Sequence, residues 1–401
     1  MRVLHLSTTT SGGAGRAAVR SVDALKLLGI EAKLLSRDDA KGQLSKISKY
    51  RSLKFSTKSS TITLLQRLLV QNSNELITTL STDLFQESRE ILENIQDFDI
   101  IHLHASYNYF SPMKLIDKLG DMPIVITLHD QRLLTGGCHY TTTCQGFMSD
   151  CSNCPKVSHL GKKIVKHTKV SMNNSIKKLD NQRIHLVTPS NWLQNQIVGI
   201  PEFIRVPKTQ VYNCIPGSFF SESVIGHTQE NEFRVGMIAT DISSPYKGFE
   251  FFMKGISHLK QNYGIQLKVI LVTNKNMRNY SNPDFDVELV FPKDDEGYLQ
   301  ILDSLSVACV PSSSDNSPNV IAETLARRVV VVASNSGGVG EIPFALGLQT
   351  FRYGDLESFC EAMILGLKKS RLSLEQYSLL RNMVSEEKHA RKLLKIYKSM
   401  I

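Results

Sequence analysis

The most constraining feature of this chain is the alternation of short apolar strands with glycine-containing turns and helices. Residues 2–7 (RVLHLS) predict a strand, and residues 8–15 predict a polar turn that carries glycines. Residues 17–28 repeat apolar side chains at helical spacing, and Gly29 is the expected helix C-cap. A second strand at 30–36 completes a βαβ unit, which implies a parallel sheet and an α/β, doubly wound domain.

The alternation runs in two series. The first continues with strands predicted at 99–104, 124–129 and 185–188. The second starts at Phe233, and it predicts the following elements: helix 248–263, strand 267–272, helix 298–304, strand 306–310, helix 319–328 and strand 329–333.

Pro and Gly punctuate the stretch between the two series, residues 211–220 (VYNCIPGSFF). We therefore expect two Rossmann-like domains that face each other across a cleft. The first comprises residues 1–212, with a C-terminal helix at about 385–401 packing back on it, and the second comprises residues 213–384.

Composition excludes several classes of protein. Of the 401 residues, 41% are hydrophobic, which is too many for a disordered chain. No apolar run approaches the roughly 18 residues that span a bilayer. The apolar run at the start of the sequence is too short to be the core of a signal peptide. Seven cysteines, an odd number, argue against a secreted disulfide framework. We expect a soluble cytoplasmic protein.

The positive charge is concentrated. Forty-seven Lys and Arg against 38 Asp and Glu give a net charge of +9, and neither residues 40–74 nor residues 151–179 contain an acid. Both stretches can be ordinary solvated faces. They can also face anions such as a lipid-linked acceptor or the phosphates on the inner face of the cell membrane. Aromatic residues are sparse in both, which disfavours a nucleic-acid partner.

Residues 311–341 carry the most specific pattern. Asp315 lies in a loop after a buried strand, and Glu323 lies early in the next helix. The loop–helix junction offers backbone N–H groups and the positive end of a helix dipole, which suit a phosphate; its residues are Ser317, Asn319 and Val320. Carboxylates on either side can accept hydrogen bonds from sugar and ribose hydroxyls, so the segment suits a nucleotide-sugar. An ordinary βα loop with two acids eight positions apart is the alternative.

The segment resembles the E-x7-E signature of family 4 retaining glycosyltransferases, which have the GT-B fold. Here it reads D-x7-E, and the Gly-Gly-x-x-Glu of the family follows as Gly337, Gly338 and Glu341. The resemblance implies that Asp315 holds sugar hydroxyls and Glu323 the ribose. Asp is one methylene shorter than Glu, so the sugar would sit deeper or the donor would differ.

The resemblance extends over nearly the whole chain. Residues 11–18 (SGGAGRAA) look like the amino-terminal glycine loop of the family, in which Gly12 and Gly13 would approach the donor phosphates. A tight turn is the alternative. Residues 124–130 (IVITLHD) resemble the strand that ends in a histidine of the donor-sugar pocket, so His129 would contact the transferred sugar. The alternative is a histidine that merely ends a strand.

Lys247 lies in a Tyr-Lys-Gly-Phe segment that resembles the Lys-Gly segment of the family, whose lysine binds the departing diphosphate. A fixed ammonium stabilises the charge that develops there. The family often has an arginine a few residues earlier, and residues 240–245 (TDISSP) contain none. No acidic motif for a divalent cation is visible, so we expect catalysis without a cofactor.

Four cysteines lie within 17 residues: Cys138, Cys144, Cys151 and Cys154. The terminal Cys-x-x-Cys fits a tetrahedral zinc site, and four thiolates would complete a closed structural one. Reduced cysteines packed in a loop and disulfides formed on isolation are the alternatives. The surrounding TGGCHY…C…CxxCP segment resembles one in a subgroup of bacterial polysaccharide glycosyltransferases.

These features together predict an enzyme, a hexosyltransferase-type retaining glycosyltransferase. It would move a sugar from a nucleotide-sugar donor to a hydroxyl of an oligosaccharide or lipid-linked glycan in polysaccharide biosynthesis. Two alternatives stay open: a GT-B enzyme acting on small soluble sugars, and a non-catalytic, zinc-bearing scaffold or binding protein on the same fold.

Overall fold

The computed structural model describes residues 1–36, 81, 89–92, 95–106, 110–178, 183–220, 233–273, 285–341, 346–369 and 372–401. The chain divides into two compact units. Unit 1 comprises Met1–Cys214 and Glu386–Ile401, and unit 2 comprises Ile215–Ser385. The division after Cys214 lies next to the expected junction after residue 212. The first acid-free stretch, residues 40–74, lies outside the described residues.

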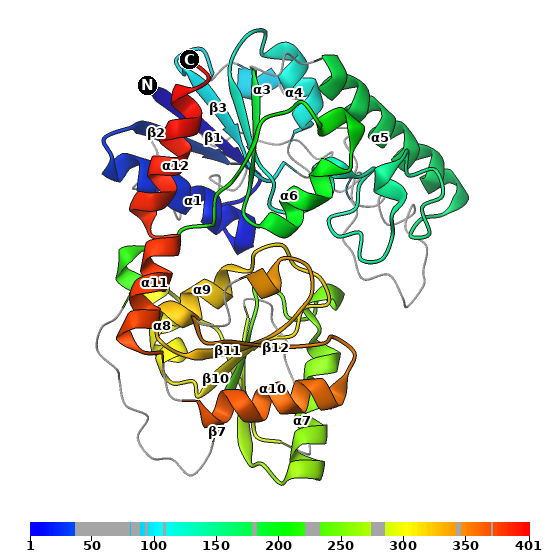
Figure 1. Ribbon diagram of the computed structural model, residues 1–401. Coiled ribbons are helices and arrows are strands. Elements are labelled where there is room, and N and C mark those ends of the chain that lie inside the picture. Colours follow the sequence, from blue (N-terminus) through cyan, green and yellow to red (C-terminus); the bar gives the residue numbers. More distant parts are fainter. Residues whose placement is uncertain are drawn as a thin grey trace. The chain divides into compact units, whose positions relative to one another are not determined.

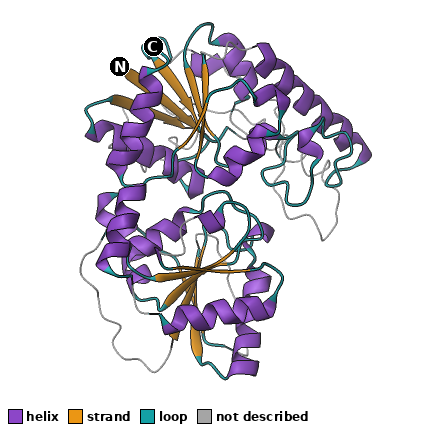
Figure 2. Ribbon diagram, in the orientation of Figure 1, coloured by secondary structure: helices purple, strands orange, loops and turns teal. Residues whose placement is uncertain are grey.

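Unit 1 is built on a six-stranded parallel sheet with helices on both faces (Figures 1 and 2). The strand order is β2-β1-β3-β4-β5-β6. Its strands are β1 (Arg2–Ser7), β2 (Glu31–Ser36), β3 (Ile100–Leu103), β4 (Ile124–Thr127), β5 (Ile184–Thr188) and β6 (Lys208–Gln210). Its helices are α1 (Gly12–Leu27), α3 (Arg89–Leu92), α4 (Pro112–Lys118), α5 (His159–Lys178), α6 (Asn191–Val198) and α12 (Glu386–Lys398).

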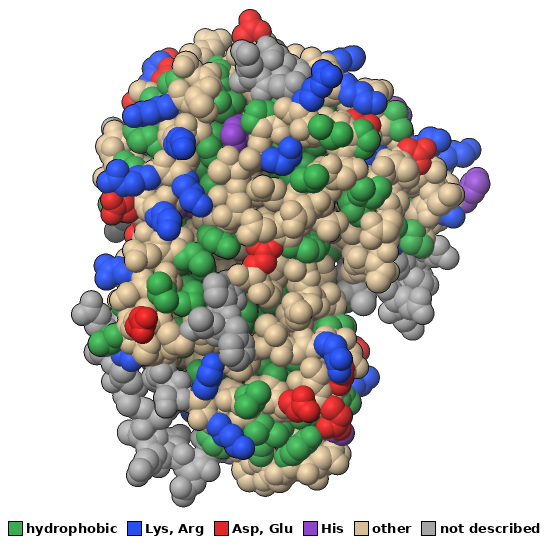
Figure 3. Space-filling model, in the orientation of Figure 1, with side chains coloured by type: hydrophobic (Ala, Val, Ile, Leu, Met, Phe, Trp, Pro, Cys, Tyr) green, Lys and Arg blue, Asp and Glu red, His purple; other side chains and the backbone are tan. Residues whose placement is uncertain are grey.

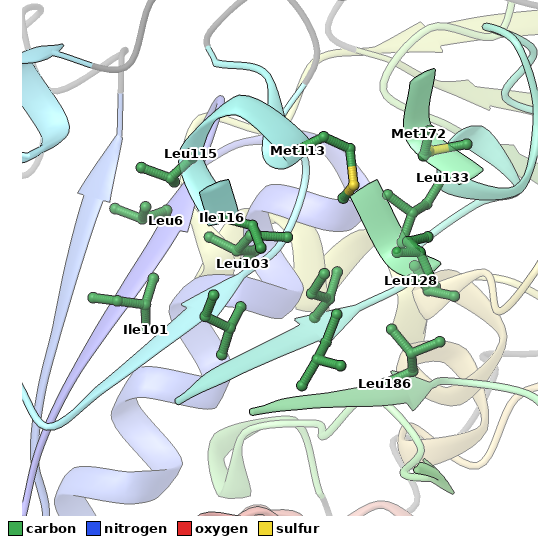
Figure 4. Close-up of a cluster of buried hydrophobic side chains, with 14 of the residues drawn as sticks. Leu6, Ile101, Leu103, Met113, Leu115, Ile116, Leu128, Leu133, Met172 and Leu186 are labelled. Carbon is green, nitrogen blue, oxygen red and sulfur yellow. The ribbon is translucent and has the colours of Figure 1, made fainter. Parts of the chain in front are cut away.

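Strand alternation gives the sheet of unit 1 two different buried faces. Leu4 and Leu6 of β1 point to one face, where they join a large cluster of aliphatic side chains. Figure 4 shows part of this cluster, including Leu103 of β3 and Leu115 and Ile116 of α4. The opposite face packs against α1 and α12, and its strand residues include the buried histidines His5 and His102.

The last helix returns to unit 1. Leu393 and Tyr397 of α12 are buried in the same cluster as Val22 and Leu25 of α1. His389 of α12 shares a hydrogen bond of 2.9 Å with the Ser21 hydroxyl of α1. The C-terminal segment therefore completes the face of the sheet that α1 covers.

Unit 2 repeats the architecture. Its six-stranded parallel sheet has the order β12-β11-β10-β7-β8-β9. The strands are β7 (Phe233–Ile238), β8 (Leu267–Val272), β9 (Val287–Val290), β10 (Val307–Val310), β11 (Val330–Ser334) and β12 (Leu348–Phe351). The helices are α7 (Phe249–Tyr263), α8 (Asp295–Asp303), α9 (Asn319–Ala326), α10 (Leu356–Lys368) and α11 (Leu374–Val384).

The core of unit 2 is aromatic at one face. Phe252 of α7 and Phe359 of α10 are fully buried against the strands, with their ring centroids 6.5 Å apart. On the other face α9 packs against β11 and α11. Both units are thus parallel sheets between helical layers, the expected doubly wound α/β class.

Several boundaries differ from the predicted ones. α1 begins at Gly12, so the first glycines belong to a helical turn and not to an extended loop. β4 ends at Thr127, which leaves His129 in the loop beyond the strand. α8 begins at Asp295, three residues before the expected start, because the Asp294 side chain caps it by accepting a 2.8 Å bond from the Gly297 N–H. Within the described part of the chain, no helix is both long and apolar enough to cross a membrane.

Candidate functional site

The loops after β7 and β10 meet at the point where unit 2 reverses its strand order. From β7 the chain builds outward through β8 and β9, and it then returns to β10 on the other side. The Ser313 N–H donates to the carbonyl oxygen of Tyr246 at 2.8 Å and so joins the two loops. Ligands of open α/β sheets bind at such reversal points, beyond the carboxyl ends of the strands.

Two predicted site residues from these loops form an ion pair. Lys247 Nζ lies 2.6 Å from Asp315 Oδ2, and the two side chains are 23% and 8% exposed. Burial disfavours the charge on Lys247, but the Asp315 carboxylate outweighs it and holds the pKa of the ammonium above its usual value. The carboxylate also accepts the Asn316 N–H on Oδ1 at 2.9 Å. Lys247 is therefore a fixed cation beyond the carboxyl ends of the central strands β7 and β10.

Gly248 lets Lys247 approach the second loop. Its φ is +75°, and a Cβ at this position would collide with the carbonyl oxygen of Pro311. Gly248 is also the N-cap of α7. The Lys-Gly pair is thus required by the close approach of the two backbones, in addition to any contact with a ligand.

The predicted Gly-Gly segment lies against the backbone of Asp315. Gly338 N–H donates to the Asp315 carbonyl oxygen at 2.9 Å, and a Cβ on Gly337, whose φ is +68°, would collide with the same oxygen. Glu341 follows in a short 3₁₀ turn, where its N–H donates to the Gly338 carbonyl oxygen at 3.3 Å. The segment holds the loop of Asp315 in place from the β11 side.

α9 starts directly after this loop. Pro318 is its N-cap residue and makes no side-chain cap, and the residues around the first turn are half-buried: Ser317, Asn319 and Val320. The positive end of the helix dipole therefore lies close in sequence to the Lys247–Asp315 pair. This end of the helix has the chemistry that suits a phosphate group.

Glu323 is deeply buried in α9. It is 2% exposed, and its Oε2 accepts a hydrogen bond from the Tyr298 hydroxyl of α8 at 2.8 Å. Tyr298 fixes the rotamer of the carboxylate, and sequence reasoning did not identify it. The structure thus places Asp315 in the loop before α9 and Glu323 in the second turn of that helix, as the sequence predicted.

In unit 1 a cavity of about 40 Å³ lies at the carboxyl ends of β3 and β4. Residues 104–106 and 128–130 line it, together with Arg132, and His129 is among them. Burial lowers the pKa of His129 to about 4, and nearby Asp130 offsets only part of this effect. His129 is therefore a neutral imidazole at pH 7.

Asp130 is held by a closed set of hydrogen bonds. Its Oδ2 lies 2.6 Å from His139 Nδ1, and its Oδ1 accepts the Arg132 N–H at 2.8 Å. Ser81 closes the set, since its hydroxyl bonds both His139 Nε2 at 2.9 Å and Arg132 Nε at 3.1 Å. Although burial opposes ionisation, the contacts with His139 lower the pKa of Asp130 below its usual value.

The glycines after β1 have different structural requirements. Gly12 has a φ of +70°, and a Cβ added at Gly12 or Gly13 would meet no described residue outside its own helix within 4 Å. Gly15 is the tightly packed one, because a Cβ there would lie 2.7 Å from the carbonyl oxygen of Thr9. The open surroundings of Gly12 and Gly13 leave room for the predicted ligand approach.

Three buried histidines next to His129 were not predicted. His5, His102 and His104 each offer a nitrogen within 4.8 Å of the others, which is close enough for a shared metal ion. Both ring nitrogens of His104 are hydrogen-bonded, and those of His102 bond the Tyr397 and Thr127 hydroxyls at 2.6 and 2.7 Å. The arrangement is therefore a hydrogen-bonded cluster. The only signal of this cluster in the sequence was histidine at alternate positions of predicted strands, on one face of the sheet.

The four loop cysteines are free thiols that influence one another electrostatically. The Cys138 and Cys154 thiols share a hydrogen bond, which lowers the pKa of Cys154. Cys144 Sγ accepts the Gly146 N–H at 3.4 Å, and Cys151 and Cys154 accept backbone N–H groups from Gly136 and Lys156. Among the described residues no three sulfurs gather within 4.8 Å.

Two buried lysines accompany these thiols. Lys169 is fully buried, and its Nζ has no hydrogen-bond partner among the described residues. Burial lowers the pKa of Lys169, and electrostatic interaction with Cys151 is the largest effect that raises it again. Lys156 is 7% exposed and donates to the Tyr140 carbonyl oxygen at 2.9 Å. Both ammonium groups favour the thiolate form of neighbouring cysteines, although burial keeps the pKa of Cys151 above its usual value and the hydrogen bond with Cys154 raises the pKa of Cys138.

A known protein family resembles the second unit. Residues 232–368 match the family model described as Glycosyl transferases group 1. The matched region lies within unit 2 and contains Lys247, Asp315, Glu323 and Glu341. The similarity to this family model is therefore confined to unit 2.

A curated relative is similar over a shorter stretch. The putative colanic acid biosynthesis glycosyl transferase WcaC of Escherichia coli (strain K12) is 25% identical over 104 residues, 23% of this chain. The match spans 26% of that relative, about a quarter of its length.

Solved structures resemble the whole chain. HepE of Anabaena, in complex with UDP-glucose, aligns with a TM-score of 0.67 at 13% identity, covering 100% of both chains. Sucrose-phosphate synthase from Thermosynechococcus elongatus aligns with a TM-score of 0.66 at 12% identity, covering 100% of this chain and 99% of that one. At this level of identity the likeness shows the fold, which is GT-B.

Proposed function

We propose that this protein is a retaining glycosyltransferase that moves a sugar from a nucleotide-sugar to a hydroxyl of a glycan acceptor. The observation that carries the proposal is the Lys247–Asp315 ion pair at the strand reversal of unit 2, within the region that matches the group 1 glycosyl transferase model. UDP-glucose in HepE supports a nucleotide-sugar as the donor class.

The donor would lie along the loop–helix segment of unit 2. In this proposal the dipole of α9 and the Lys247 ammonium share the diphosphate, and Asp315 accepts hydrogen bonds from sugar hydroxyls. Glu323, held by Tyr298, accepts hydrogen bonds from the ribose. Lys247 already has a counter-ion in Asp315, so binding a diphosphate exchanges one anionic partner for another.

Transfer proceeds with retention in this proposal. The bond between the anomeric carbon and the diphosphate oxygen breaks, and its electron pair stays on the diphosphate. The acceptor hydroxyl oxygen bonds the anomeric carbon on the same face, and its proton passes to the departing phosphate oxygen. Lys247 stabilises the negative charge that develops on the diphosphate. His129 contacts the transferred sugar, as the resemblance implies, and no divalent cation takes part.

The anomeric configuration of the product tests retention. We expect an α-linked sugar nucleotide to give an α-linked product, which the anomeric proton coupling in an NMR time course reports directly. A β-linked product, or a trapped glycosyl ester of Asp315, would contradict the proposed course of the reaction. The same time course counts donor hydrolysis separately from transfer.

The acceptor class we propose is an oligosaccharide or lipid-linked glycan in polysaccharide assembly. The name of the WcaC relative, which refers to colanic acid biosynthesis, supports it. The likeness to a sucrose-phosphate synthase favours the second candidate, an enzyme acting on small soluble sugars. Efficient transfer to a free monosaccharide or sugar phosphate would favour that candidate over the first.

We also propose peripheral attachment to the inner face of the cell membrane, through α5. The helix contains no acidic residue and exposes lysines on one side, and Leu160 beside them is 64% exposed. Figure 3 shows Lys and Arg side chains along this edge of unit 1. Lys166 and Lys177 are partly neutralised by Asp150 and Glu202, at 3.1 and 3.3 Å.

Vesicle binding tests this attachment. We expect sedimentation with vesicles containing anionic lipid and release at high salt, because exposed charges are screened beyond about 10 Å at 0.1 M salt. Lys162→Glu/Lys163→Glu should abolish sedimentation, whereas Lys254→Glu in unit 2 should not. Equal binding to neutral vesicles, or indifference to salt, would rule out electrostatic attachment.

We further propose that Cys138, Cys144, Cys151 and Cys154 bind a structural zinc ion. The backbone N–H groups on three of the sulfurs and the two buried lysines support it, because both stabilise thiolates, the form that zinc binds. A zinc ion would require the sulfurs to draw closer together than they lie in this structure. It would order a polar loop beside the cavity of unit 1.

A further inference from the structure

Two of the buried histidines, His5 and His104, form a continuous row with His129, which lines the cavity of unit 1. His5 Nδ1 lies 2.9 Å from His104 Nε2, and His104 Nδ1 lies 2.9 Å from His129 Nε2. In each link the ring centroids are 5.2 Å apart and the ring planes differ by 21°. The rings are therefore joined through their nitrogens. In both links, Nδ1 of one ring faces Nε2 of the next ring along the row from His5 to His129.

The row allows only two arrangements of protons when the rings are neutral. Each neutral imidazole has one N–H and one bare nitrogen. If His104 carries its proton on Nδ1, both links form only when His5 and His129 are also protonated on Nδ1. If His104 carries its proton on Nε2, both links form only when His5 and His129 are also protonated on Nε2. The tautomer of His129 is thus coupled to that of His5, two rings away.

The buried end of the row favours the first arrangement. His5 is fully buried, and its Nε2 has no hydrogen-bond partner among the residues that the structure describes. In the Nε2–H arrangement this nitrogen would be a buried donor without an acceptor, a state that native structures largely avoid. In the Nδ1–H arrangement the same nitrogen carries only a lone pair.

The charges near the two ends act in the same direction. Asp130 is the charged neighbour of His129, and Lys26, partly offset by Asp23, lies toward His5. With every N–H pointing from His5 toward His129, the positive end of the row is the end that interacts with the carboxylate, and the negative end is the end that interacts with the ammonium. All three rings are neutral at pH 7, because burial lowers their pKa values, to about 3 for His5 and about 4 for His129.

We propose that His5 and His104 are positioning residues that hold His129 in the Nδ1–H tautomer, so that His129 donates a hydrogen bond and does not act as a base. The preferred ligand group at His129 is then an acceptor oxygen, such as a sugar hydroxyl or ring oxygen. The assignment of a sugar rests on the proposed function, whereas the tautomer does not. His102 shares the cluster but bonds the Tyr397 and Thr127 hydroxyls, so it is outside the row.

Long-range ¹H–¹⁵N NMR of protein labelled with ¹⁵N-histidine tests the tautomer without any ligand. The expected spectrum shows a protonated Nδ1 and a bare Nε2 for His5, His104 and His129, with nitrogen–nitrogen coupling across both links. A proton on Nε2 of His129, or equal populations of both tautomers, would overturn the proposal. Because no nucleotide is present, this outcome is independent of whether the protein transfers sugar.

A pair of variants tests the positioning roles. In His104→Leu, His129 loses its donor, and we expect its Nε2 signal to move toward the protonated position. The matched control His102→Leu removes the buried histidine two residues earlier, in β3, and should leave the His129 tautomer unchanged. The proposal is wrong if both variants shift His129 equally. If His104→Leu does not fold, the wild-type spectrum alone decides.

Discussion

Replacing Lys247 by methionine should lower kcat for the proposed sugar transfer by about 10²–10³-fold, the range found when one fixed group that stabilises developing negative charge is removed. Methionine keeps the length of the stem and deletes the ammonium, which interacts more strongly with the departing diphosphate than with the bound donor. The loss therefore falls on kcat more than on KM. Initial rates of nucleoside diphosphate release, measured over a range of donor concentrations, separate the two.

Two further variants distinguish a loss of catalysis from a loss of folding stability. Lys247→Met leaves the Asp315 carboxylate, which is 8% exposed, without its counter-ion, and breaking such a pair can destabilise a protein by about 3–5 kcal/mol. Combining it with Asp315→Asn removes the uncompensated charge and should restore the melting temperature without restoring kcat. Lys254→Met, on the exposed side of α7, should retain full activity. A Lys247→Met enzyme within a few-fold of wild type would contradict the role of Lys247.

Protein purified without chelator should contain one zinc ion per chain, measured by inductively coupled plasma mass spectrometry. Apparent zinc-binding free energies of about 10–16 kcal/mol are known for four-ligand sites in small domains. That is enough to order the cysteine loop, so Cys154→Ser should lose the metal and expose the loop to proteolysis. A chelator should do the same to the wild-type protein.

A thiol titration distinguishes a zinc-bound loop from a metal-free one. The chain has seven cysteines, and a zinc-bound protein should react rapidly at none of the four loop thiols until the metal is removed. Cys309→Ala, a buried cysteine of β10, is the matched control and should keep its zinc. Metal-free protein with an unchanged cleavage pattern would show that the loop is held by packing and hydrogen bonds alone.

The architecture could be predicted because it follows from local patterns. The strand at Leu267–Val272 has the predicted bounds, and the helix before Gly29 ends with that glycine at a φ of +74°, since both depend on nearby residues. β9 and β12 were not predicted, because short edge strands of mixed exposure have little period-two signal. α1 begins earlier than its apolar spacing suggests, because its first turn contains glycines, which are poor helix formers and give no apolar periodicity.

The candidate site was predictable where chemistry and spacing coincide. Asp315, Glu323 and Lys247 carry charges in a recognisable pattern, and the structure brings two of them into direct contact. The contact itself was not predicted, because 68 residues separate the partners and only the sheet order joins their loops. The histidine row was missed for a similar reason: His5 and His104 look like ordinary strand residues until β1 and β3 pair.

The most direct test of the account is a thermal-shift screen of the purified protein against UDP, GDP, ADP and their common sugar conjugates, with Lys247→Met in parallel. A ligand at 100 times its Kd adds about 2.7 kcal/mol to the free energy of unfolding. We predict that nucleotides of one base and their conjugates raise the melting temperature of the wild-type protein and raise that of Lys247→Met much less. No shift with any nucleotide would contradict the donor site and favour a non-catalytic protein on a GT-B fold.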